Sequence, residues 1–131
     1  MVTEMIELAR RFVDLWYSPE RRDELRSIVA DDYVHHSPSG DLDYEHFAGQ
    51  LDHIVAALAE PEWQVVQAIA DGDIVAVYVT FAGVHRGNFF GIPATGRRVT
   101  TAGACFMRVV DGRIVEDWDA WALQTILHQI S

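Results

Sequence analysis

The chain has 131 residues, half of them apolar, and a formal net charge of −10, and all ten of its basic residues are arginine. This length fits one compact domain, residues 1–131, built around one hydrophobic core. The arginines are scattered along the chain, whereas a nucleic-acid-binding protein needs a clustered cationic face, so nucleic acid and anionic membrane are poor partners.

The first half of the sequence predicts three helices. Apolar side chains recur at spacings of three and four residues over residues 6–16, which indicates one apolar helix face. Ser18 followed by Pro19 is typical of a helix start, so a second, short helix is expected to begin there. A third helix is expected over residues 43–59, ended by Pro61.

The second half predicts a sheet and a last helix. Strands are expected from Trp63 onward and over residues 74–84, 100–110 and 113–119, with turns at 71–73 and 111–112. A helix over residues 120–130 closes the domain. Helices followed by strands predict an α+β fold, in which the N-terminal helices pack on the concave face of a cone-shaped, curved antiparallel (mixed) sheet. Such a cone has a mouth that can hold a pocket.

Both faces of this sheet are predicted to be apolar. In the strand over residues 74–84, one face carries Val75, Val77, Val79 and Phe81, and the other carries Ile74, Ala76, Tyr78 and Ala82. A sheet with one packed face would alternate with polar residues. We therefore expect helices on one face and a partner subunit on the other, that is, a homodimer through the sheet.

Three polar stretches could carry chemistry, and the first is residues 31–38. It holds the adjacent His35 and His36, which point to opposite sides of an extended segment, so at most one of them can face a given pocket. The alternative is that one histidine is exposed and the other satisfies a loop carbonyl.

The second stretch, residues 83–98, lies between two long strands. It holds His85, four glycines, a proline and the adjacent Phe89 and Phe90, which make it too long and too apolar for a simple hairpin turn. It is typical of a lid or a pocket rim. The alternative is a crossover loop whose two phenylalanines plug the core.

The third stretch, residues 114–121, places three carboxylates beside two tryptophans. A carboxylate next to apolar surface has its pKa raised by desolvation and can act as a general base or acid near neutral pH. Strand alternation separates Glu116 and Trp118 from Asp117 and Asp119. For Asp119, the alternative is that it caps the last helix.

Other chemistries find no support in the sequence. Cys105 lies in mid-strand with no basic neighbour, so we expect it in the core. The six histidines and one cysteine form no closely spaced ligand pairs of the structural-zinc type, so no metal is predicted. The N-terminal residues carry glutamates inside a periodic apolar pattern and do not resemble a secretory leader, so we expect a cytoplasmic protein.

Four segments match the motifs of one known family. Residues 32–38 are similar to D-Y-V-x-H-x-P, residues 85–97 to H-x-G-x-F-x-G-x-P-x-T-G-R, and residues 116–118 and 127–131 to E-x-W and L-x-Q-L-G. Together they resemble the SnoaL-like polyketide cyclases, or ester cyclases, of the nuclear transport factor 2-like superfamily. The resemblance implies a cone-shaped α+β barrel with a deep apolar pocket, usually a dimer through the outer sheet face.

The resemblance also implies an activity. Cyclases of this family close the last ring of aromatic polyketides by an aldol condensation without metal or cofactor, using an acid–base aspartate of the C-terminal segment. For this chain it implies a small apolar or aromatic ketone as ligand, Asp119 as base, and His36 and His85 as proton donors or orienters. The residues expected to bind substrate are Trp16, Tyr33, His35, Phe89, Phe90, Phe106 and Trp118.

Two positions depart from the family pattern. Ala122 stands where many members have a second aspartate, and Ser37 stands where a polar amide is often seen. If position 122 supplied the acid–base carboxylate, only Asp119 or Asp117 could replace it here. The alternatives are therefore isomerase or epoxide-hydrolase chemistry in the same pocket, or a non-catalytic ligand-binding or accessory protein.

Overall fold

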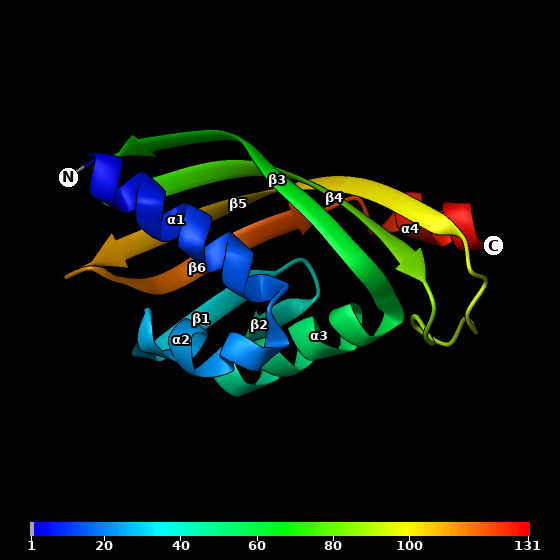
Figure 1. The fold of residues 1–131 in the computed structure, drawn as a ribbon. Coiled ribbons are helices and arrows are strands. Elements are labelled where there is room, and N and C mark those ends of the chain that lie inside the picture. The colour runs from blue at the N-terminus through cyan, green and yellow to red at the C-terminus, as the bar shows by residue number, and fades with distance from the viewer. Residues whose placement is uncertain (1) are drawn as a thin grey trace.

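The computed structural model describes residues 2–131 and confirms an α+β fold (Figure 1). Its elements are α1 (Val2–Trp16), the 3-10 helix η1 (Pro19–Arg21), α2 (Arg22–Ser27), β1 (Val29–Ser37), β2 (Gly40–Leu42), α3 (Tyr44–Ala57), β3 (Leu58–Asp71), β4 (Ile74–His85), β5 (Arg98–Val110), β6 (Arg113–Trp121) and α4 (Leu123–Ile130). No helix within the described range is long and apolar enough to cross a membrane.

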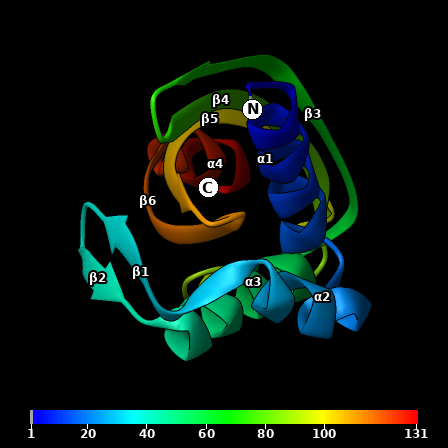
Figure 2. The same cartoon turned by 90° about the vertical axis from the view of Figure 1, so that its left-hand side faces the viewer.

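The six strands form one mixed sheet in the order β2-β1-β6-β5-β4-β3. All neighbours are antiparallel except β1 and β6, which run parallel. Figure 2 shows strands β3 to β6 curving around α1, with β1, α2 and α3 on the open side. The parallel pair places His35 directly opposite Asp117, and His36 opposite Trp118. Two polar stretches that are about eighty residues apart in the chain therefore lie side by side.

Helix α1 lies in the hollow of the sheet because its apolar face is continuous. Phe12 is fully buried, stacks on Phe47 of α3 with ring centroids 6.1 Å apart, and meets Trp16 and Tyr33 edge-on. The sheet supplies the other side of this core from Val75, Val77, Val79, Cys105, Met107 and Ile114. The predicted core role of Cys105 and the predicted packing of the N-terminal helices on the concave face are both confirmed.

Strand β3 begins earlier than predicted. It starts at Leu58 and includes Pro61, which was expected to lie between helix and strand. A proline has no N–H to donate, so it is tolerated here because β3 is at the edge of the sheet. The pairing with β4 also shifts register between Ala59 and Glu62, where Glu60 adopts a left-handed backbone with φ of 52°.

The last helix begins later than predicted. Strand β6 continues to Trp121, and α4 follows an N-cap at Ala122 that has no side-chain hydrogen bond. Asp119 lies within the strand, paired with Cys105 of β5. The interpretation of Asp119 as the cap of the last helix is therefore wrong, because cross-strand pairing extends β6 through residue 121.

Candidate functional site

A cavity of about 370 Å³ opens between the end of α1, helix α3 and the concave face of the sheet. Its aromatic lining comes from Trp16, Tyr17, Phe47, Phe81, Phe89, Phe90 and Trp121. Its polar lining comes from His35, Ser37, Ser39, Gln50, Thr101 and Asp119. An apolar cavity with a few convergent polar groups is typical of a small-molecule site.

A second hollow is larger, about 640 Å³, but it lies against β3, β4 and β5 and is more open. Its charged residues are Glu62 and Arg98, an exposed pair with 3.6 Å between the guanidinium nitrogen and the carboxylate oxygen. Exposed ion pairs are weak and solvated, so this pair does not indicate a catalytic group. The smaller cavity is therefore the candidate site.

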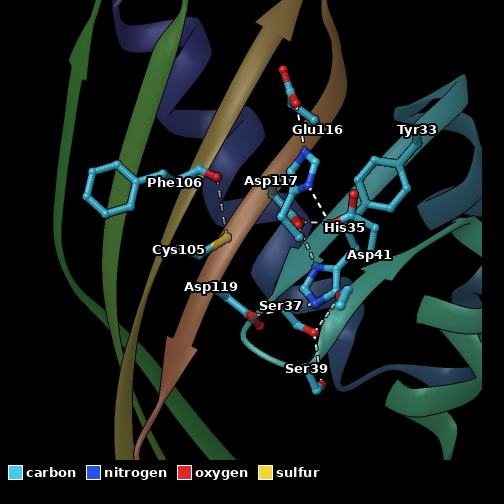
Figure 3. Close-up of polar contacts among 12 residues, drawn as sticks. Tyr33, His35, Ser37, Ser39, Asp41, Cys105, Phe106, Glu116, Asp117 and Asp119 are labelled. Atoms are coloured by element: carbon cyan, nitrogen blue, oxygen red, sulfur yellow. Dashed lines mark hydrogen bonds and ion pairs between the residues drawn. The ribbon is translucent and has the colours of Figure 1, made fainter.

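His35 reaches the cavity from β1 and is held from behind by Asp117 (Figure 3). The His35 side chain is 2% exposed, and its Nδ1 lies 2.5 Å from Asp117 Oδ1. The Tyr33 hydroxyl donates to the other oxygen, Asp117 Oδ2, at 2.7 Å. Because Asp117 is fully buried, both of its oxygens are satisfied by these two neighbours on β1 and not by water.

Asp119 lies two residues beyond Asp117 on the same face of β6 and lines the cavity. Its side chain is 18% exposed, and its Oδ1 is 3.5 Å from His35 Nε2. Burial raises the pKa of Asp119 to about 6, with a further increase from the charge of Asp117, against the opposing effect of His35. At neutral pH this carboxylate is ionised and yet basic enough to accept a proton.

The charge of His35 follows from the same neighbours. Burial lowers its pKa, but the hydrogen bond and charge of Asp117, helped by the charge of Asp119, outweigh burial and raise the pKa above its ordinary value. The cavity wall thus carries a histidine ring between two carboxylates, both of which favour its protonated form. Such an arrangement can accept a proton at one atom and donate a proton at another, close by.

His36 points the other way, as alternation in a strand requires. Its Nδ1 lies 2.9 Å from Asp41 Oδ1, its Nε2 lies 2.8 Å from Glu116 Oε1, and its ring stacks on Trp118 with centroids 5.1 Å apart. The guanidinium of Arg108 covers the Trp118 ring at 5.8 Å. Contrary to expectation, His36 and Trp118 therefore lie on the outer face of the sheet and outside the cavity lining.

Three more predicted site residues lie elsewhere than expected. His85 is fully buried beside the cavity wall, where its Nδ1 lies 2.9 Å from Thr95 Oγ1 and anchors the segment that follows β4. Phe106 is 49% exposed on the outer face and points away from the site (Figure 3). Tyr33 is buried behind the cavity and reaches Asp117 instead of the lining. Strand parity decides the case of Phe106, and core packing decides those of His85, which meets the buried Phe89 edge-on, and of Tyr33.

The structure brings five predicted residues to the cavity: Trp16, His35, Phe89, Phe90 and Asp119. Phe89 is almost fully buried and Phe90 is 54% exposed, so the segment after β4 both plugs the core and forms the rim. Within residues 2–131, no group of histidine, cysteine and acidic side chains could hold a metal ion.

Other lining residues had not been predicted to bind a ligand. Phe47 lies on the stripe of the third helix that the sequence assigns to the core, and Tyr17 directly follows the first helix. For Trp121 the one signal in the sequence is the glycine at position 103. Gly103 lies opposite Trp121 in β5, and a Cβ at Gly103 would collide with the indole. The glycine lets the indole lie across the strand and reach the cavity.

The fold and the cavity define a cone-shaped α+β protein of the nuclear transport factor 2-like class. The chain belongs to the SnoaL-like polyketide cyclase family, whose model matches residues 6–130.

Two curated relatives are aklanonic acid methyl ester cyclases. DnrD of Streptomyces peucetius is 28% identical over 127 residues, covering 89% of this chain and 85% of its own length. DauD of Streptomyces sp. (strain C5) is also 28% identical over 127 residues, covering 89% and 76%.

Solved structures of similar proteins have the same fold as this chain. AclR of Streptomyces galilaeus, described as a candidate hydroxylase, superimposes with a TM-score of 0.90 at 25% identity, covering 99% of this chain and 86% of that one. IdmH of Streptomyces antibioticus, described as a candidate polyketide cyclase, has a TM-score of 0.84 at 28% identity, covering 94% and 95%. The family model, the two curated relatives and IdmH support a cyclase role for the chain.

Proposed function

We propose that this protein is an enzyme that performs acid–base chemistry on an apolar or aromatic ketone, in the simplest case the aldol-type closure of a ring in a polyketide-like substrate. The observation that carries the proposal is Asp119, which lies on the wall of an aromatic cavity with its pKa raised to about 6. The cyclase names of the relatives DnrD and DauD support ring closure as the reaction.

In this proposal Asp119 takes a proton from a carbon flanked by carbonyl groups, and the electron pair of that C–H bond delocalises as an enolate. The enolate carbon forms a bond to a second carbonyl carbon, whose oxygen accepts a proton from His35 Nε2. The proton on Asp119 then returns to His35 across the 3.5 Å that separates the two groups. Side chains supply both acid and base, so no cofactor enters the proposed reaction.

Ala122 does not weaken the assignment of the base. This residue lines the open hollow on β3 to β5 and not the aromatic cavity. Asp119 is the carboxylate that the fold presents to a ligand in the cavity. Isomerisation or epoxide opening would use the same two groups, and the product formed distinguishes these reactions from ring closure.

The experiment is an assay of ring closure and of proton abstraction. The purified protein is incubated in D₂O with aromatic esters that carry a 1,3-dicarbonyl side chain, and the product and its deuterium content are measured by mass spectrometry. We expect cyclised product and enzyme-dependent deuterium incorporation at the activated carbon. The His36→Gln variant is the control and should retain this activity. Tight binding of the esters without exchange or product would instead identify a non-catalytic binding protein.

The rate of this reaction is expected to depend on pH in a bell shape. The value of kcat/KM should rise as pH increases through about 6, because Asp119 must lose its proton to act as a base. It should fall again at higher pH as His35 loses the proton that it donates, at a pH above the ordinary histidine value. A rate that stays constant between pH 5 and about pH 8 would contradict a base with this pKa.

We further propose that the outer sheet face joins two copies of the chain. Cross-strand register places Ile69, Ala76, Phe106 and Trp118 in one row across four strands. Ile69, Phe106 and the nearby Tyr78 are all exposed. Contiguous exposed apolar side chains are typical of an interface, and a second copy offers the same surface.

The double variant Tyr78→Glu/Phe106→Glu is therefore expected to be a monomer at concentrations where the unmodified protein is a dimer. Two carboxylates on this face would have to be desolvated in each copy on association. Analytical ultracentrifugation measures the mass. Val2→Glu, at an equally exposed apolar side chain on α1, should leave the dimer intact. A monomeric unmodified protein at all concentrations would rule out this interface.

A further inference from the structure

We propose that Asp117, anchored by Tyr33, is the positioning residue that fixes the ring of His35 and keeps His35 Nε2 as a proton donor toward the cavity. The catalytic consequence of this role rests on the function proposed above. The arrangement of the three side chains stands on the contacts alone.

The contacts of Asp117 determine where the proton of His35 resides. Oδ2 accepts a hydrogen bond from the Tyr33 hydroxyl at 2.7 Å, and Oδ1 lies 2.5 Å from His35 Nδ1. A carboxylate oxygen can only accept, so an ionised Asp117 requires a proton on His35 Nδ1. The other ring nitrogen, Nε2, is then the end of the imidazole that faces Asp119, 3.5 Å away (Figure 3).

Because Asp117 is buried, its contact with His35 favours the charged form of His35. Asp117 is fully buried, and a buried carboxylate without a countercharge is very unfavourable. His35 is the cation in direct contact with it, so ionised Asp117 stabilises the imidazolium. Of the other groups around His35, Asp119 also favours its charge, whereas the charge of His36 on the same strand opposes it.

The remaining neighbours of His35 carry no charge. Helix α3 supplies the ring of Phe47, whose centroid is 4.5 Å from that of His35. Strand β5 supplies Cys105 to the same buried cluster as Asp117 and Asp119, and burial raises the pKa of its thiol well above the ordinary value, so it stays protonated. Asp117 and Asp119 are therefore the two groups that favour the charged form of His35, and His36 is the group that opposes it.

Tyr33 holds Asp117 because its own ring cannot move freely. The ring centroid lies 5.5 Å from that of Phe47, 6.4 Å from Phe12 and 6.5 Å from Tyr44. Burial and the charge of Asp117 raise the pKa of the Tyr33 hydroxyl, so it remains a neutral donor. A rigid donor on one oxygen orients the other oxygen toward His35.

The register of β1 and β6 decides which motif residues join this positioning set. It pairs His35 with Asp117 on the concave face and His36 with Trp118 on the outer face. The set therefore combines Tyr33, a fixed position of D-Y-V-x-H-x-P, with His35 and Asp117, which the motifs leave open. The fixed positions His36, Glu116 and Trp118 lie on the outer face instead.

The test follows the two histidines by NMR in the full-length protein, labelled with ¹⁵N and free of substrate. In the unmodified protein we expect His35 to carry protons on both ring nitrogens at neutral pH and to titrate above the ordinary value of about 6.5. In Asp117→Asn the pKa of His35 should fall by about 1 to 3 units, because the countercharge is lost. An unchanged pKa would overturn the positioning role.

Glu116→Gln is the matched control, since it removes the adjacent carboxylate on the same strand. This substitution should lower the pKa of His36, whose ring nitrogen hydrogen-bonds to the Glu116 carboxylate, and should leave the pKa of His35 unchanged. If Asp117→Asn does not fold, the unmodified protein decides: a neutral His35 at pH 7, or one with its proton on Nε2 alone, would contradict the proposal.

Kinetics then separates this inference from the proposed function. Tyr33→Phe retains the aromatic ring and should lower kcat with little change in KM, because Tyr33 does not line the cavity. Since the NMR measurements need no substrate, a correctly positioned His35 in a protein without activity would refute the proposed function alone. Ring closure with an unperturbed His35 would refute the positioning role alone.

Discussion

Replacing Asp119 with asparagine is expected to lower kcat for ring closure by about 100- to 10,000-fold, the usual contribution of a positioned general base. Asparagine has nearly the same size and shape, so the aromatic cavity should still bind the ligand. The measurement compares steady-state kinetics with ligand affinity, which can be followed by quenching of the tryptophans that line the cavity, Trp16 and Trp121. Loss of turnover with retained affinity would assign Asp119 to the chemical step.

The control for this variant is Asp41→Asn. Asp41 is an exposed carboxylate that contacts His36 at the edge of the sheet and does not line the cavity. Its loss should leave turnover nearly unchanged. Unchanged turnover in Asp119→Asn would remove Asp119 from the mechanism, and an equal loss in both variants would point to a general effect of charge.

Replacing Phe12 with alanine is expected to lower the free energy of unfolding by about 3–5 kcal/mol. Phe12 is fully buried at the junction of α1, α3 and β1, where its ring contacts Trp16, Tyr33 and Phe47. Truncation removes these contacts and leaves a void in the core. Urea denaturation followed by circular dichroism measures the loss, which is large for a domain whose total stability is about 5–15 kcal/mol.

Phe90→Ala is the matched control for stability. Phe90 is the same residue type but is 54% exposed at the cavity rim, so its truncation should cost less than about 1 kcal/mol. A loss at Phe12 no greater than that at Phe90 would show that α1 does not contribute to the central core. If Phe12→Ala fails to fold, Phe12→Leu should show a smaller loss of the same sign.

The two faces of the β1–β6 pair have different tasks. The concave face carries a charge system of Asp117, His35 and Asp119, in which the neighbours and burial raise the pKa of His35 and of Asp119. The outer face carries His36 and Glu116, which are partly exposed and bound to other charged groups. Solvent screens the outer set, so the groups able to move protons at neutral pH are those inside.

Much of the fold follows from local patterns in the sequence. The apolar stripe over residues 6–16 predicts α1, and the turns at 71–73 and 111–112 delimit the hairpins of the sheet. These features depend on interactions between near neighbours, which the sequence displays directly. The hairpin of β1 and β2 and the full length of β3 were missed, because β1 is held by pairing with the distant β6, and because Pro61 and the left-handed backbone of Glu60 interrupt the strand pattern at the start of β3.

The candidate site could be predicted from the sequence only in part. Alternation by itself predicted that His35 and His36 point to opposite sides, and that Asp117 and Asp119 share a face. It could not decide which side becomes the cavity, because that depends on how β1 pairs with β6 and on which face of the sheet the helices cover. Tertiary structure made that choice, and it placed His35 rather than His36 beside the buried carboxylates.

The acidic residues likewise show what the sequence determines and what only the structure decides. The sequence by itself determined an acidic composition, and it predicted an α+β fold with a cluster of three carboxylates over residues 116–119. Only the tertiary structure decided that Asp117 is fully buried and that Asp119 lies in the cavity wall, while the third, Glu116, is partly exposed on the outer face. That difference arises because desolvation depends on what packs around a side chain, and in this chain the packing partners of Asp117 and Asp119 come from β1, more than eighty residues away.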